Sequence, residues 1–175
     1  RRGRWREAIE VAKHSCRIEP DVSEAWLRAS PLFLLANDIE GYERFRRDCA
    51  KQFAKGSGTY NQDRYIKACM LYPFVSELPE LPIEEFRSGS KSVTNHNMRT
   101  FIHGGCALVS YREGDYEGAR EWVRRAPRAV APANALVDVV GALTEFRHGE
   151  EQRSRDLHEQ DNASVPSELR SLGNE

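Results

Sequence analysis

The chain has 175 residues, 30% of them charged, and its 26 basic and 27 acidic side chains leave a formal net charge of −1. This near-neutral balance provides no general attraction to nucleic acid or to an anionic membrane surface. No apolar run in the sequence approaches the roughly 20 residues that a membrane-spanning helix needs. We therefore expect a soluble chain without a membrane partner.

Apolar and small residues recur three and four positions apart along most of the chain, which places them on one face of a helix. No segment alternates apolar and polar residues over a useful length, so strands are not expected. In chain order, the predicted helices are 4–18, 22–36, 40–54, 60–72, 81–93, 97–112, 116–126, 133–147 and 150–160.

Prolines interrupt this pattern in two places. Pro31 lies inside the predicted helix 22–36, which we expect to kink or to end early, at a cost of about 3 kcal/mol. Residues 73–82 contain three prolines, which prevent the helix before them from continuing. The next helix is predicted to begin near Pro82, since proline is acceptable in a first turn.

A turn pattern recurs along the chain. Gly3 and Gly114 are each followed by an aromatic residue two positions later and by alanine five positions later. Asn37 lies 34 positions after Gly3, and Gly149 lies 35 positions after Gly114. Asparagine, like glycine, tolerates the left-handed conformation of such a turn. The sequence therefore predicts an array of short helix-turn-helix units.

This pattern resembles the tetratricopeptide repeat, a family of helix-turn-helix units with a period of about 34 residues. The matching residues are Gly3, Trp5, Ala8 and Pro20 in the first unit, and Ala107, Tyr111, Gly114, Tyr116, Ala119 and Ala126 in the fourth. The resemblance implies an all-α fold, a right-handed superhelical array of antiparallel helix pairs. Tyr42 stands where the repeat has its packing alanine, so we expect the helices to be pushed apart there.

The resemblance also implies an organisation into about four and a half units. The repeat domain would span 1–160 with a polar tail at 161–175, and its units are 1–22, 23–58, 59–96, 97–132 and 133–160. The last unit has a polar second helix, which is typical of a terminal cap. Since the chain begins in the middle of a unit, we expect it to be a fragment of a longer protein.

Arrays of this family usually bind an extended peptide or a helix of a partner protein in the concave groove lined by the first helices. The resemblance implies the same non-catalytic function here, with a partner that the sequence does not identify. The groove candidates, chosen by repeat position, are Glu24, Arg28, Asp63, Arg64, Lys67, Tyr111 and Arg112. For Tyr111, and for Leu27 and Leu108 beside these candidates, a place in the core between helices is an equal alternative.

Residues 25–42 and 67–73 also resemble the repeat regions joined to serine/threonine kinase domains in large bacterial proteins. No kinase signature is present in the sequence, so a kinase domain would lie outside it. This resemblance implies an alternative function, a regulatory or spacer module for an enzyme domain of the same parent chain.

No catalytic or metal-binding constellation stands out. Cys16, Cys49, Cys69 and Cys106 are scattered without a CxxC pair, so we expect four free, buried thiols in a reducing cytoplasm, with neither zinc nor a cofactor. His103 lies three positions from Cys106, but a packing role beside two glycines is favoured over a ligand role. Arginines gather on the second helices, interleaved with acidic residues, as expected of a solvated face. A surface for anions or RNA is the alternative interpretation, which the net charge disfavours.

Overall fold

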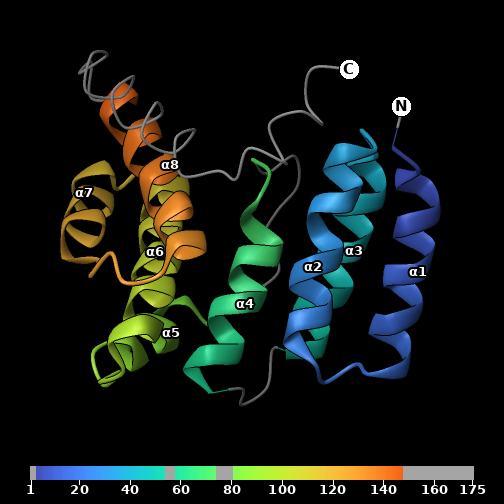
Figure 1. The fold of residues 1–175 in the computed structure, drawn as a ribbon, viewed down its shortest axis with the longest axis horizontal. Coiled ribbons are helices and arrows are strands. Elements are labelled where there is room, and N and C mark those ends of the chain that lie inside the picture. The colour runs from blue at the N-terminus through green and yellow to red at the C-terminus, as the bar shows by residue number, and fades with distance from the viewer. Residues whose placement is uncertain (1–2, 54–57, 74–80, 148–175) are drawn as a thin grey trace. The chain divides into compact units, whose positions relative to one another are not determined.

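The computed structural model describes residues 3–53, 58–73 and 81–147. The described chain is all helical and contains no strand, which confirms the predicted fold class at the level of secondary structure (Figure 1). Its helices are α1 (Trp5–Ile18), α2 (Ser23–Leu35), α3 (Ile39–Phe53), α4 (Thr59–Met70), α5 (Ile83–Ser90), α6 (His96–Glu113), α7 (Tyr116–Arg125) and α8 (Ala131–Arg147).

These bounds lie within two residues of the predicted ones, except at the end of α5. That helix ends at Ser90 instead of continuing to residue 93. The chain must leave α5 early because Asn95 is already the N-cap of α6, where its side chain accepts a hydrogen bond from the Met98 amide at 3.0 Å. The ninth predicted helix, 150–160, and the predicted tail lie outside the described residues.

The sequence predicts a kink or an early end at Pro31, and the early end does not occur, since α2 continues through this residue to Leu35. Proline has no N–H, so the Leu27 carbonyl lacks its usual helical donor four residues on. The Ser30 hydroxyl replaces that donor and donates to the Leu27 carbonyl oxygen at 2.9 Å. Pro31 itself is exposed, so its ring does not have to fit into a packed core.

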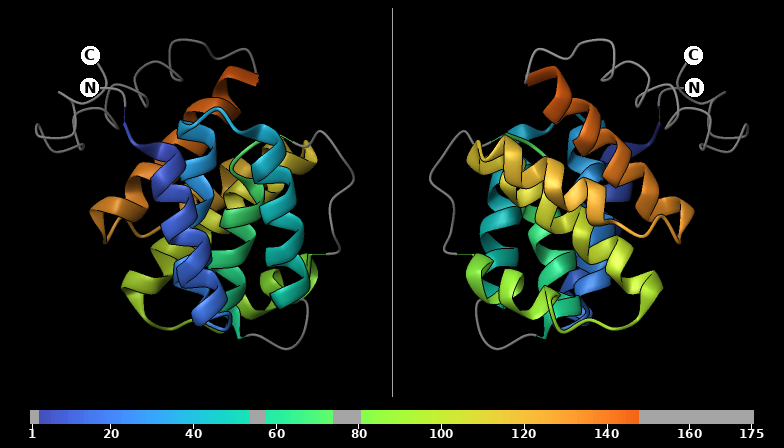
Figure 2. Two further views of the ribbon diagram at one scale, coloured as in Figure 1. Left: turned by 90° about the vertical axis from the view of Figure 1, so that its right-hand side faces the viewer. Right: turned by 90° about the vertical axis from the view of Figure 1, so that its left-hand side faces the viewer.

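The chain divides into two compact units, and the first comprises Gly3–Gly89. In it, α2 packs against α1, α3 and α4, and α3 also packs against α4 (Figures 1 and 2). The core between α2 and α3 is aromatic, with the Phe45 ring 5.1 Å from that of Trp26 and 5.0 Å from that of Phe33. Burial of these rings stabilises the unit through the apolar area that they remove from water.

Tyr42 is accommodated in this core, and its hydroxyl gains a specific role. The side chain is fully buried, and the hydroxyl donates to the Ala68 carbonyl at 2.9 Å and accepts from the Leu71 amide at 3.1 Å. The phenol thus ties α3 to the last turn of α4. Burial raises the pKa of Tyr42 far above its ordinary value, so the hydroxyl stays protonated.

The second unit begins at Ser90, and its described helices are α6, α7 and α8. Here α6 packs against both α7 and α8, and α7 packs against α8. Gly104 allows α6 and α8 to approach closely, because a Cβ at this position would lie only 3.3 Å from side-chain atoms of Leu136 and Val137. His103 and Cys106 are buried in the same helix.

The turns before α3 and α7 have the same construction. Asn37 and Gly114 both adopt left-handed backbone conformations, with φ of 56° and 80°, as the sequence predicted. In each turn the following residue, Asp38 or Asp115, accepts a hydrogen bond from the amide three residues on, at 2.8 and 2.9 Å. The two units therefore share a local turn geometry that reverses the chain between packed helices.

Candidate functional site

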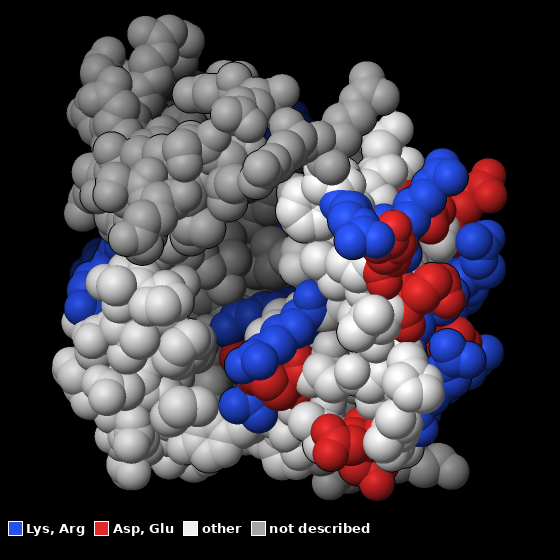
Figure 3. All heavy atoms as spheres, turned by 45° about the vertical axis from the view of Figure 1, so that its right-hand side comes forward, with Lys and Arg blue, Asp and Glu red and all other residues white. Residues whose placement is uncertain are grey.

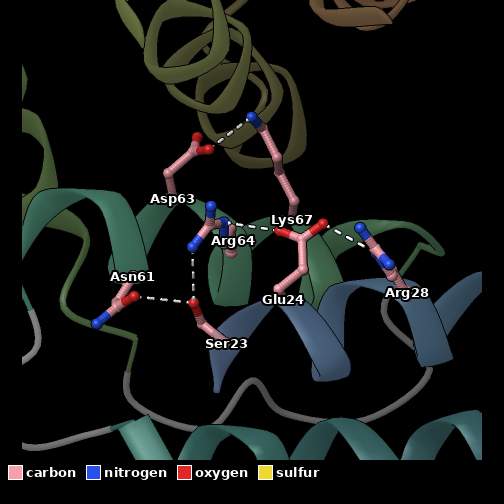
Figure 4. A network of polar contacts seen from close by, with 7 residues as sticks. All are labelled: Ser23, Glu24, Arg28, Asn61, Asp63, Arg64 and Lys67. Carbon is pink, nitrogen blue, oxygen red and sulfur yellow. Dashed lines mark hydrogen bonds and ion pairs between the residues drawn. The ribbon is translucent and has the colours of Figure 1, made fainter. Parts of the chain in front are cut away.

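Five of the seven predicted groove residues lie together on α2 and α4, which pack against each other (Figure 4). With two neighbours they form a set that we call the α2–α4 polar network: Ser23, Glu24, Arg28, Asn61, Asp63, Arg64 and Lys67. Tyr111 and Arg112 belong to the second unit and are described separately.

Glu24 lies between two guanidinium groups. One carboxylate oxygen accepts from Arg28 Nε at 2.9 Å, and the other pairs with Arg64 Nε at 3.0 Å. The Arg28 side chain is 78% exposed, whereas those of Glu24 and Arg64 are each 37% exposed. Exposed ion pairs of this kind contribute little to stability, about 0 to 1 kcal/mol, so these groups are accessible to a ligand at small energetic cost.

Two residues that the sequence analysis did not single out hold this arrangement in place. The Ser23 hydroxyl donates to the Asn61 side-chain oxygen at 2.8 Å, and Arg64 Nη1 donates to the Ser23 oxygen at 3.4 Å. Ser23 is buried at the start of α2, so the bond fixes this end of α2 against α4. No sequence pattern links residues so far apart, because their contact depends on how two helices pack.

Asp63 and Lys67 form a second, buried pair within α4. Their charged atoms lie 2.7 Å apart, and their side chains are only 6% and 7% exposed. Burial raises the pKa of Asp63, while the Lys67 ammonium opposes this shift. Each charge therefore depends on the other, and neither side chain is accessible to a partner as Arg28 is.

Tyr111 and Arg112 lie side by side near the end of α6. The Arg112 guanidinium lies 5.7 Å from the centroid of the Tyr111 ring, within the range of a cation–π contact, and the Tyr116 ring lies 5.7 Å from that of Tyr111. Both predicted residues are half-buried. Leu108, one turn earlier, is buried, which agrees with the core alternative for that residue.

The four cysteines are free and buried. Cys49 and Cys69, although scattered in sequence, meet between α3 and α4, where a hydrogen bond with Cys69, together with burial, raises the pKa of Cys49. Within the residues that the structure describes, no group of three or more His, Cys, Asp or Glu side chains could hold a metal ion. None of the described helices combines the length and the apolar character required to cross a membrane.

Charges of both signs are intermixed on the first unit. Figure 3 shows basic and acidic side chains side by side over the N-terminal helices. Their pairs include Lys13 with Glu10 at 2.9 Å and Arg44 with Glu40 at 3.9 Å. This is the mixed, solvated surface that the interleaved sequence predicts.

Comparisons of the chain with family models, with curated proteins and with solved structures found no match. Any functional conclusion therefore depends on the chemistry of the side chains.

Proposed function

We propose that this chain is a tetratricopeptide-like module, a right-handed array of antiparallel helix pairs that binds a partner protein and has no catalytic function of its own. The order of helix packing supports this architecture. The first helix of a pair, α2 or α6, packs against the second helix of the same pair, α3 or α7. It also packs against the first helix of the following pair, α4 or α8. The shared left-handed turn before α3 and α7 supports it as well.

The exposed part of the α2–α4 polar network is the proposed contact surface. Glu24 occupies the Nε atoms of both Arg28 and Arg64, so the outer nitrogens of Arg28 remain available for other acceptors. A guanidinium has five N–H donors in a planar fork that suits carboxylates. We infer an acidic segment of the partner as the ligand. The observation that carries this proposal is the pair of accessible guanidinium groups held on two adjacent helices by one carboxylate.

The chemistry of the network supports a binding role over a catalytic one. It contains no thiol and no imidazole, and its one buried carboxylate, Asp63, is paired with Lys67 at 2.7 Å. Ser23 donates its hydroxyl proton to an amide oxygen, which is not a general base.

A display selection tests the proposal. Random peptides are selected on the immobilised chain, and the affinity of an enriched sequence is measured for the R28A/R64A double variant. We expect enrichment of Asp and Glu, and a loss of affinity of about tenfold or more, because a hydrogen bond to a charged group contributes about 1.5 to 3 kcal/mol.

The matched control is Arg47→Ala, which removes an exposed arginine of α3 outside the network. A second control, Arg124→Glu, reverses a charge on α7, and both should leave the affinity unchanged. The proposal would be wrong if the selected peptides bound R28A/R64A with the same affinity as the natural chain but bound R124E more weakly. That result would place the contact surface on the second helices of the pairs.

A further inference from the structure

A hollow of about 760 Å³ lies in the second unit, separate from the α2–α4 polar network. Its walls come from the segment between α5 and α6 and from the facing sides of α6 and α7. The lining residues are Ser90, Lys91, Val93, Thr94, Arg99, His103, Trp122 and Arg125. The volume falls in the range of small-molecule sites, about 300 to 1,000 Å³.

The charge of this hollow is of one sign. Lys91, Arg99 and Arg125 line it, and no carboxylate does. Arg125 pairs with Glu121 at 2.5 Å, a carboxylate outside the lining that it shares with Arg124. Lys91 and Arg99, by contrast, form no ion pair with any residue of the described ranges. Elsewhere in this unit an arginine such as Arg120 does have an acidic partner, the Glu145 carboxylate at 3.1 Å. Two unneutralised cations at one concave surface attract an anion more strongly than the intermixed charges elsewhere.

His103 adds a hydrogen-bonding group and no charge. Its Nδ1 lies 3.1 Å from the Arg125 carbonyl oxygen, so an N–H at this atom donates to that oxygen and leaves Nε2 as an acceptor. Burial, with the nearby Arg99 and Arg125, lowers the pKa of His103 and keeps the ring neutral.

Trp122 provides an aromatic wall. Its ring lies 5.3 Å from the His103 ring at an interplanar angle of 61°, so an edge-to-face contact orients it. The ring is only half-buried and lines the hollow. A planar group that enters the hollow can therefore stack on an indole that the fold already holds in place.

We propose that this hollow binds a small phosphorylated molecule with a planar ring system, of the nucleoside monophosphate class, with its phosphate at Lys91 and Arg99 and its ring against Trp122. The site lies outside the network proposed for partner binding, so the two proposals can fail independently. Threonine and neutral histidine suit the ligand's hydroxyl and ring nitrogen groups, which need both donors and acceptors.

Calorimetric titration of the full chain with AMP, ribose 5-phosphate and inorganic phosphate tests this inference. We expect AMP to bind, ribose 5-phosphate to bind at least about fivefold more weakly because stacking is lost, and inorganic phosphate to bind no more tightly than ribose 5-phosphate. The K91A/R99A double variant should lose affinity for AMP by about tenfold or more, whereas the control Arg47→Ala should not change it. Far-ultraviolet dichroism checks that both variants are folded.

Four results would overturn the inference. The first is the absence of AMP binding at millimolar concentration, and the second is AMP binding that K91A/R99A leaves unchanged. Tighter binding of a phosphoserine peptide than of AMP is the third, since it would assign the hollow to a phosphorylated protein segment. The fourth result is an equal affinity for AMP and ribose 5-phosphate. It would show that the ring of the ligand does not stack on Trp122, and it would refute the proposed class of ligand.

Discussion

The hydroxyl of Ser30 should stabilise α2 only because residue 31 is proline. In a regular helix the Leu27 carbonyl accepts from the amide of residue 31, but here the donor is the Ser30 hydroxyl at 2.9 Å. Replacing Ser30 by alanine removes this donor from a fully buried position. The hydrogen bond itself is part-buried. Leaving its carbonyl unsatisfied costs about 1 to 3 kcal/mol, and the higher helix propensity of alanine offsets up to about 0.5 kcal/mol of that cost. The expected loss is about 1.5 kcal/mol.

The same substitution should cost little in a P31A background. An alanine at position 31 would supply the missing backbone N–H to the Leu27 carbonyl, so S30A should then lose no more than about 0.5 kcal/mol. Pro31 is exposed, so its removal creates no cavity in the core. The four chains form a double-mutant cycle with an expected coupling of about 1 kcal/mol.

The free energies of unfolding would be measured by urea titration with dichroism detection, with a check that the denaturant slope is the same in all four chains. A cost of S30A that is equal in both backgrounds would refute the idea that the hydroxyl replaces the amide. It would assign any loss to packing of the serine side chain.

Three further predictions concern the buried phenol, the turns and the thiols. Tyr42→Phe should lower the free energy of unfolding by about 2 kcal/mol, because the hydroxyl no longer bonds to the buried Ala68 carbonyl or to the part-buried Leu71 amide. The exposed Tyr60 provides the control Tyr60→Phe, and equal effects of the two substitutions in urea titrations would contradict the assigned role. Gly114→Ala should lower the free energy of unfolding by about 1 to 2 kcal/mol, because the φ of 80° at this position disfavours a side chain. Asn37→Gly should be neutral or slightly stabilising in the same assay. A neutral Gly114→Ala would be inconsistent with the left-handed turn. The four cysteines should react slowly with a thiol reagent in the native chain and completely in denaturant, because all four are buried in the native chain. The raised pKa of Cys49 also keeps its thiol protonated and so less reactive. Rapid reaction of the native chain would show that a thiol is accessible.

Much of the local structure was predictable from the sequence. Helix bounds followed from the spacing of apolar residues, which is a local property of the chain. The left-handed turns at Asn37 and Gly114 followed from the residue types that tolerate positive φ. The early end of α2 that Pro31 allowed did not occur, and this expectation came from treating proline alone without the hydroxyl beside it.

The candidate site was predictable only in part. Repeat position selected Glu24, Arg28 and Arg64, and α2 and α4 do bring these together. The same rule selected Asp63 and Lys67, which the structure buries against each other. Periodicity assigns a residue to a helix face, but it does not show how deep that face lies once other elements have packed over it.

What the sequence determined by itself is therefore the all-helical class, the approximate ends of the helices and the two turns, since each depends on residues within a few positions of one another. Tertiary structure decided which charges are neutralised. Glu24 meets Arg64 across two helices, whereas Arg99 and Lys91 meet no carboxylate in the described ranges and line a hollow with Trp122. Such pairings depend on the packing of whole helices, because small changes in the angle between two helices move distant side chains into or out of contact.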